Sequence, residues 1–264
     1  MTRFNNELKD FNRDPLCDQE LEEDWSGEQV LHELTKMAVP LFIVAATIFR
    51  FVHDHQEDAR ERLATMLTSQ RLGHMSQLAQ TYMPVLKQLV ASKDKRHTAD
   101  AERLYAEFRT IVGAIITLAE PLSRVALASL LQLPANTVVF RLKPLHSVLQ
   151  IPAARDAPIR LLHLSFGEFL TSSEISDRPY AVNGTATHAM LLTKCIGLLS
   201  RDPNGLRENI CGLDYPGQPR WDLTPDQVVE HLPAEIQYAC RYWVYHAQQS
   251  RRKAYDNDDV HTFL

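Results

Sequence analysis

The sequence HLSFG at residues 163–167 is the first candidate for chemistry in this chain. It resembles the GxSxG pattern of hydrolases with the first glycine replaced, and it lies between an expected strand and a short helical stretch. In that pattern the serine is a nucleophile held on a sharp turn above a multi-stranded parallel sheet. Because a helical chain does not provide such a sheet, a hydrolase that uses Ser165 is kept only as a third alternative.

The second candidate is a basic helix expected over residues 134–149. It carries Arg141, Lys143 and His146 and no acidic residue, which suits a helix that enters the major groove of DNA. Pro144 lies inside it and is expected to kink the helix or to end it early. The net charge of the chain is −5, whereas DNA-binding domains usually carry a basic surplus. A winged-helix DNA-binding regulator is therefore the alternative, and nucleic acid is not the expected partner.

Other common catalytic and binding motifs do not occur in the sequence. It contains neither the phosphate-binding loop GxxxxGKS/T nor the dinucleotide fingerprint GxGxxG. His53 and His55 are two residues apart, a spacing that does not place them on one face of a helix. None of the four cysteines forms a CxxC pair, and no set of His, Cys and carboxylate residues has metal-site spacing. The sequence therefore predicts no metal site and favours reduced thiols.

Composition favours a mainly α-helical protein. Hydrophobic residues make up 45% of the chain and charged residues 23%, as in ordinary globular proteins. Only 9 glycines occur in 264 residues, so few positions suit the positive φ angles of tight hairpins. The N-terminus has no apolar signal segment, and the apolar run 41–52 is shorter than the roughly 20 residues that cross a bilayer. We expect a cytoplasmic protein with no membrane contact.

The first hundred residues are expected to be a polar tail followed by helices. Residues 1–24 are polar and acidic and are interpreted as a tail or a truncated element. Ser26 begins a capping-box pattern, and apolar residues at helical spacing follow it until Pro40 interrupts them. The 41–52 run is apolar on nearly all sides, which is typical of a buried helix. Residues 25–100 are therefore predicted to form a helical segment.

Three helices are predicted in the middle of the chain. The first covers residues 103–119 and has its apolar residues on one face. Ser123 is expected to cap a short helix that runs through Leu131, and Pro134 suits the first turn of the next. This order of helix, short helix, turn and longer helix is a helix-turn-helix layout.

A two-stranded hairpin is predicted directly after these helices. The apolar runs 148–151 and 159–164 are separated by a polar loop bounded by prolines. On the second strand, period-two alternation places His163 on the same face as Leu161. Helix-turn-helix followed by a hairpin wing makes residues 101–178 a winged-helix-like domain.

The last part of the chain, residues 179–264, is expected to be a helical connector domain. Thr224 begins a capping box with a proline at the first helical position. Pro233 opens the last helix. Its apolar face is predicted to contain Ile236, Ala239, Cys240, Trp243 and Val244.

Five blocks of sequence occur here in the order in which a known family has them. They are WSGEQVLHELTKMAVPLFIVAATIFRFV, LHSVLQIP, IRLLHLSFGEFL, LRENICGL and LPAEIQYACRYWVYH, between Trp25 and His246. Together they resemble the middle of fungal NACHT-type signal-transduction (STAND) NTPases, the heterokaryon-incompatibility-like proteins that often carry C-terminal WD repeats. The chain resembles the region after the ATPase core, namely helical lid, winged helix and helical connector, without P-loop or repeats.

The resemblance implies two nucleotide contacts. Pro40 is similar to the lid proline that packs on the adenine base in related NTPases, and His163 is similar to the winged-helix histidine that contacts the phosphates of ADP. An imidazole N–H can donate to a phosphate oxygen. Both roles require an ATPase core, so no cofactor is expected for the isolated chain, whereas ADP or ATP belongs to the complete family architecture.

The resemblance also implies a function in incompatibility-like, innate-immune signalling. We expect a non-catalytic regulatory fragment of a NACHT-type switch protein, which acts by docking onto an ATPase core or a full-length relative. It is not expected to be an enzyme, because the P-loop is missing from its sequence. The apolar face of about residues 30–52, which would meet the core, is expected to be exposed.

Overall fold

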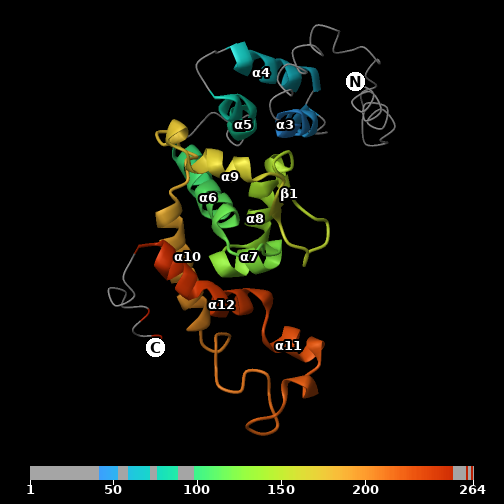
Figure 1. The fold of residues 1–264 in the computed structure, drawn as a ribbon, viewed down its shortest axis with the longest axis vertical. Helices are drawn as coiled ribbons and strands as arrows, with labels where there is room; N and C mark the ends of the chain where they lie inside the picture. Colours follow the sequence, from blue (N-terminus) through green and yellow to red (C-terminus); the bar gives the residue numbers. More distant parts are fainter. Residues whose placement is uncertain are drawn as a thin grey trace. The chain divides into compact units, whose positions relative to one another are not determined.

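The protein is mainly α-helical in the residues that the computed structural model describes, which are 42–52, 59–71, 76–88, 98–251, 260 and 263 (Figure 1). This confirms the expected fold class at the level of helix content. The helices are α3 (Phe42–Val52), α4 (Ala59–Arg71), α5 (Gln77–Lys87), α6 (Thr98–Thr117), α7 (Arg124–Leu131), α8 (Ala135–Leu142), α9 (Leu164–Thr171), α10 (Gly184–Leu199), α11 (Pro225–His231) and α12 (Ala234–Gln249). Short 3-10 helices cover Lys143–Leu145, Ser173–Ile175 and Arg220–Asp222, and the strands are β1 (Leu149–Gln150) and β2 (Arg160–Leu161).

The chain divides into two compact units. Unit 1 comprises Met1–Lys95, Pro144–Val148 and Leu162–Phe169, and unit 2 comprises Arg96–Lys143, Leu149–Leu161 and Leu170–Leu264. The four-part organisation into tail, lid, winged helix and connector stays a prediction. The polar tail and the Ser26 capping box lie outside the described residues.

Unit 1 contains three helices that bury apolar residues. α3, α4 and α5 pack against one another. Their buried side chains include Val44, Ile48 and Phe51 of α3, Leu63 and Met66 of α4, and Tyr82, Val85 and Leu86 of α5. Ser76 caps α5 by accepting a hydrogen bond from the backbone N–H of Ala79 at 3.1 Å, which satisfies one of the free donors of the first turn.

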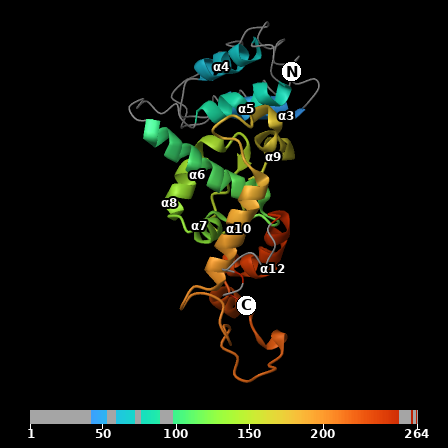
Figure 2. The same ribbon diagram turned by 90° about the vertical axis from the view of Figure 1, so that its left-hand side faces the viewer.

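Unit 2 has a core formed where α6, α7, α10 and α12 pack together (Figure 2). Phe108, Ile111 and Val112 of α6 are buried, as the helical spacing predicts. At Gly113 an added Cβ atom would lie 3.3 Å from Val182 Cγ1. The absence of a side chain at this position therefore allows the close approach of α6 to the chain that enters α10.

Two short helices, α7 and α8, follow α6 in the predicted order. Ser123 caps α7 as expected, accepting the backbone N–H of Ala126 at 3.2 Å, and Pro134 occupies the N-cap of α8. The prediction of a helix over residues 134–149 is wrong in extent, because α8 ends at Leu142 and a 3-10 turn follows. Pro144 explains the early end, since its ring clashes with the preceding turn.

The predicted hairpin exists, but its strands are shorter than expected. β1 and β2 pair antiparallel, with Leu149 opposite Leu161. Ile159 donates its backbone N–H to the carbonyl of Leu122 at 2.9 Å. Ser123, which precedes α7, forms an isolated antiparallel bridge with Pro158. The segment before α7 therefore pairs with the residues that lead into β2. Pro158 precedes β2 and cannot donate a ladder hydrogen bond, which helps to limit the pairing.

The C-terminal elements agree with the sequence except for one face of α12. Thr224 forms the predicted capping box on α11, and the apolar face of α10 is buried. On α12, however, Val244 is 45% exposed, whereas Tyr238 and His246 are buried. The predicted face of α12 is therefore wrong in part, because two polar side chains with hydrogen-bond partners take interior positions.

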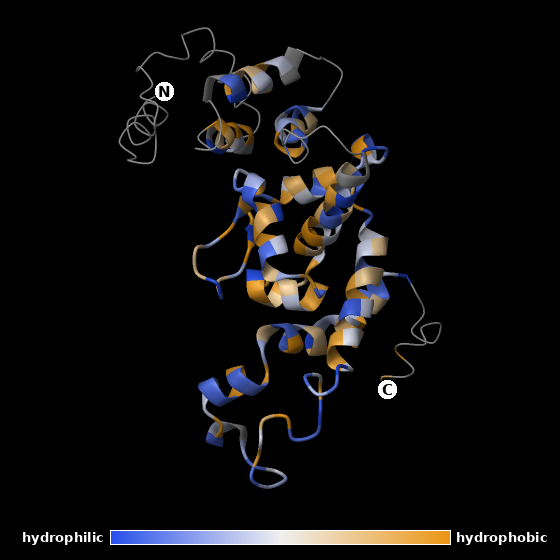
Figure 3. Cartoon of the chain, turned by 180° about the vertical axis from the view of Figure 1, so that it is seen from behind, coloured by the Kyte–Doolittle hydropathy of each residue, from blue (hydrophilic) through white to orange (hydrophobic). Residues whose placement is uncertain are grey.

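The long helices of unit 2 carry both apolar and polar residues around their circumference, as the colours of Figure 3 show. Within the described residues, we find no single helix with the length and apolar character needed to cross a membrane. In the same part of the chain, α7 and residues 135–145 pass by length and composition only when taken together, as a pair bent by 117°.

Candidate functional site

His163 lies immediately before α9, not on a strand. β2 ends at Leu161, and the carbonyl of His163 accepts the first hydrogen bond of α9, from Phe166 N–H at 3.3 Å. The expected placement of His163 on a strand face with Leu161 is therefore wrong. The side chain of His163 is exposed. It is thus placed at a helix N-terminus, where a ring nitrogen can accept a free backbone N–H.

The hydrogen bonds of His163 determine which ring nitrogen carries the proton. The backbone N–H of Ser165 donates to His163 Nδ1 at 3.1 Å. A nitrogen that accepts a hydrogen bond carries no proton, so the neutral imidazole must be protonated at Nε2. His163 therefore presents an N–H donor on an exposed side chain, which is the arrangement that an anionic oxygen would require.

Ser165 and Tyr82 support His163 from the interior of unit 1. Ser165 Oγ lies 2.7 Å from His163 Nδ1 and 2.8 Å from the hydroxyl of Tyr82. Because Nδ1 accepts, the hydroxyl of Ser165 donates to it and accepts from Tyr82. Tyr82 packs against Phe166 and Phe169 of α9, and burial raises the pKa of its hydroxyl. The donor–acceptor sequence therefore runs from Tyr82 through Ser165 to His163.

The environment of Ser165 does not favour the hydrolase alternative. Its side chain is only 7% exposed, and it is in the first turn of α9. The sheet in the described residues has two strands, whereas a nucleophile elbow is supported by a multi-stranded sheet. The hydroxyl of Ser165 instead links two hydrogen-bond partners.

Substitutions in this group are expected to destabilise unit 1 to different degrees. Ser165→Ala leaves the buried hydroxyl of Tyr82 without an acceptor, which should lower the free energy of unfolding by about 1–3 kcal/mol. Tyr82→Phe removes the donor itself and should cost about 1 kcal/mol. Urea denaturation followed by far-UV circular dichroism measures both. Equal losses, or no loss in Ser165→Ala, would contradict the proposed direction of the hydrogen bonds.

Two other sequence expectations concern the N-terminal region. Pro40, the predicted adenine contact, lies outside the described residues. The expected exposure of the 30–52 segment is wrong for the part that is described, because Val44, Ile48 and Phe51 are buried. Their burial follows from the packing of α3 against α4 and α5 within unit 1.

Two large apolar side chains are exposed on α8, where a DNA-reading helix would present basic residues. Phe140 is 67% exposed and Val139 is 41% exposed. Arg141, the one basic residue within α8, forms an ion pair with Glu107 of α6 at 2.5 Å, and its guanidinium carbon lies 5.3 Å from the centre of the Phe140 ring. Arg141 is therefore engaged within unit 2.

Glu107 is held in its charged form by two arginines. Arg103 pairs with Glu107 Oε1 at 2.9 Å, whereas Arg141 contacts Oε2. Burial raises the pKa of Glu107, but the hydrogen bonds from Arg141 and Arg103 outweigh burial, so the net pKa lies below the ordinary value. The ion pair therefore persists at neutral pH, and it fixes α8 against α6.

A second polar group, which the sequence analysis missed, lies in the core of unit 2. We call His188, His246 and Tyr238 the histidine–tyrosine chain. The Nδ1 atoms of the two histidines are 2.9 Å apart, and His246 Nε2 lies 2.8 Å from the Tyr238 hydroxyl. His188 and His246 are 58 residues apart in the sequence, so no local pattern indicated their contact.

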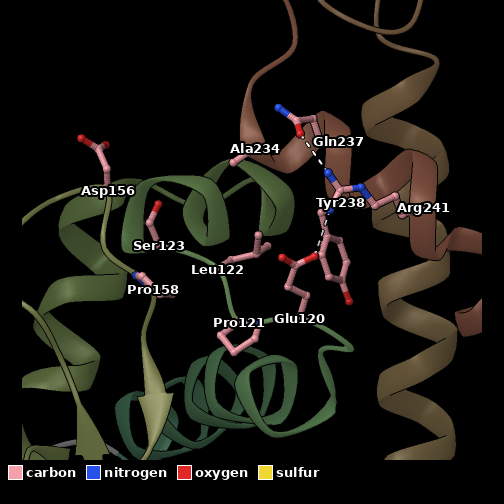
Figure 4. Close-up of a pocket in the computed structure, with 10 residues that line it drawn as sticks. All are labelled: Glu120, Pro121, Leu122, Ser123, Asp156, Pro158, Ala234, Gln237, Tyr238 and Arg241. Carbon is pink, nitrogen blue, oxygen red and sulfur yellow. Dashed lines mark hydrogen bonds and ion pairs between the residues drawn. The ribbon is translucent and has the colours of Figure 1, made fainter. Parts of the chain in front are cut away.

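A pocket beside Tyr238 is lined by Glu120, Pro121, Leu122, Ser123, Asp156, Pro158, Ala234, Gln237, Tyr238 and Arg241 (Figure 4). Glu120 accepts from Arg241 at 3.1 Å, and Arg241 also donates to Gln237 at 3.1 Å. Both members of the ion pair are about half exposed. The charged groups of Glu120 and Arg241 are therefore directed at each other, and we assign no ligand to this pocket.

No group of three or more His, Cys, Asp or Glu side chains in the described parts of the chain is arranged to hold a metal ion. Comparisons of the chain with protein-family models, with curated proteins and with solved structures find no match.

Proposed function

We propose that this chain is a non-catalytic regulatory part of a NACHT-type nucleotide-dependent switch protein and that it acts by docking onto a protein partner. The partner is the ATPase core of such a switch or a full-length relative. The observation that carries the proposal is the pair of exposed apolar side chains on α8, Phe140 and Val139, beside Arg141, which is paired with Glu107. Exposed aromatic and aliphatic side chains favour contact with a protein, whereas base and phosphate contacts need available cations and polar groups.

We further propose that residues 101–178 form a winged-helix-like domain that presents α8. In support, α6, α7 and α8 are followed by the β1–β2 hairpin, and Ile159 pairs with Leu122 ahead of α7. Arg124 also donates to the carbonyl of Ala153 in the hairpin loop at 2.7 Å. These contacts connect the wing to the second helix, as the winged-helix arrangement requires.

The proposal includes a nucleotide contact at His163 when a core is present. The exposed imidazole, with its proton at Nε2, fits a phosphate oxygen of ADP. A bound ADP would supply negative charge next to this donor and so favour the docked state over the undocked one. Ser165 and Tyr82 would hold the ring in that orientation through their hydrogen bonds.

We place this function in the cytoplasm, where thiols stay reduced. In support, Cys195, Cys211 and Cys240 are free thiols. Burial raises the pKa of Cys195 to about 12, so that thiol is protonated at neutral pH and is a poor nucleophile.

The second candidate function is a winged-helix DNA-binding regulator, which the helix-turn-helix order of α7 and α8 favours. Fluorescence anisotropy with a labelled DNA duplex of mixed sequence separates the two functions. For the docking protein, we expect no strongly salt-dependent binding between about 50 and 200 mM salt. Binding that falls steeply with salt and is lost in both Arg141→Ala and Lys143→Ala would overturn docking in favour of DNA.

A further inference from the structure

The histidine–tyrosine chain has one hydrogen-bond direction that uses all its donors and acceptors. The backbone N–H of Ala119 can only donate, and it lies 3.2 Å from the hydroxyl of Tyr238. Tyr238 accepts this bond and donates its own proton to His246 Nε2. The neutral His246 ring then carries its proton on Nδ1 and donates to His188 Nδ1. The histidine–tyrosine chain thus connects the segment between α6 and α7 to α12, and it connects α12 to α10.

A single additional proton disrupts this arrangement wherever it binds. If it binds His246 Nε2, Tyr238 faces an N–H group and loses its acceptor. If it binds His188 Nδ1, the His188–His246 hydrogen bond persists only when His246 carries its proton on Nε2, and Tyr238 then again faces an N–H group. Because His246 is fully buried, no water replaces the lost bond without separation of the packed helices.

Among the described residues, the groups around the two imidazoles do not offset a positive charge. The ring of Tyr245 on α12 packs edge-on against His188 and against His246, with ring centres 5.5 and 5.3 Å apart. Cys195 of α10 and Tyr242 of α12 act on Tyr238 and raise the pKa of its hydroxyl further, after burial. These groups are a thiol and two phenols rather than carboxylates.

The carboxylate of Glu120 contacts α12 near these groups, but its hydrogen bonds go to other side chains. It accepts hydrogen bonds from Arg241 at 3.1 Å and from the hydroxyl of Tyr242 at 3.3 Å, and none from either imidazole. Within the described part of the chain, a proton on the pair would therefore be a buried charge without a carboxylate partner. In agreement, burial, followed by the neighbouring His188, lowers the pKa of His246 to about 4, and burial lowers the pKa of His188.

We propose that the histidine–tyrosine chain is a pH-sensitive fastener, in which one proton taken up by the His188–His246 pair releases α12 from α10. Release of α12 would separate Ala247 on α12 from Leu192 and Ile196 on α10, which belong to the same buried apolar cluster. This device is independent of the proposed docking function, because it requires neither α8 nor His163.

The test is amide hydrogen exchange of the full chain, with protection factors corrected for the intrinsic effect of pH. A histidine with a pKa near 6.5 when released and about 4 when packed makes the released state about 20-fold more populated at pH 5 than at pH 7. We expect protection of the α12 amides to fall by that factor while protection of α7 changes much less. Imidazole ¹⁵N shifts of the same samples should show His246 neutral at pH 6, with its proton on Nδ1.

The matched variants are His246→Gln and His231→Gln. Glutamine at position 246 has an amide that can bond on both sides but does not titrate, so most of the extra loss of α12 protection should disappear, and only the part due to His188 should remain. His231 lies on α11 and is not part of the histidine–tyrosine chain. The His231→Gln variant should therefore behave as the wild type does. If His246→Gln does not fold, the wild-type spectra decide. Titration of His246 at its ordinary pH, or equal loss of protection in α7 and α12, would overturn the proposal.

Discussion

Lowering the pH from about 7 to about 4 is expected to reduce the free energy of unfolding of unit 2 by about 3 kcal/mol through His246 alone. Burial and then His188 lower the pKa of His246 to about 4 in the folded protein. Because the unfolded chain has the higher pKa, it binds the proton first. This contribution to stability is therefore complete above about pH 6.5 and is lost as the pH falls through the range between the two pKa values.

The difference between wild type and His246→Gln isolates this contribution. Urea denaturation at several pH values gives the free energy of unfolding for each protein. Carboxylates that titrate in the same range affect both proteins equally and cancel in the difference. Between pH 6 and pH 4 the free energy of unfolding should fall more steeply with pH in the wild type than in His246→Gln. The difference in slope should correspond to the uptake of about one proton. Parallel curves would show that the buried imidazole does not resist protonation.

Replacing Phe140 by aspartate is expected to weaken docking onto a recombinant NACHT-type ATPase core by about 30-fold or more. The Phe140 side chain is 67% exposed, so the substitution removes little internal packing. Truncating a central aromatic residue of an interface typically costs about 2 kcal/mol or more, which corresponds to about 30-fold in Kd. A new carboxylate in the apolar contact adds a desolvation cost.

Trp221→Asp is the matched control for this substitution, because Trp221 is 85% exposed and lies outside α8. It should bind the core as wild type does, and the thermal midpoints of both variants should stay close to that of the wild type. Binding by calorimetry at a fixed salt concentration gives the comparison. Unchanged affinity in Phe140→Asp would remove α8 from the docking surface.

The parts of the fold that could be predicted from the sequence are those determined by neighbouring residues. The caps at Ser123 and Thr224 each need only a hydroxyl a few residues before a backbone N–H. The helical face of α6 follows from apolar spacing over a continuous segment. Pro144 likewise acts within one turn, and it ended α8 as its chemistry predicts.

The parts that could not be predicted depend on long-range contacts. Tyr82 reaches Ser165 across 83 residues, and His188 reaches His246 across 58. Apolar spacing assigned Val244 to the interior of α12 and passed over His246, because a polar residue becomes an interior residue only when a distant partner satisfies it. For the same reason His163 was assigned to a strand, since the Ser165 contacts that place it before α9 are side-chain bonds.

The most direct test of the central claim is calorimetric titration of ADP into the purified 264-residue chain. The chain contains no phosphate-binding loop, and its exposed His163 offers one donor to a phosphate, which in water contributes only about 0.5–1.5 kcal/mol. We therefore expect no binding heat up to about millimolar ADP. Tight, saturable binding of ADP by the chain alone would contradict the claim that the nucleotide is held by a separate ATPase core.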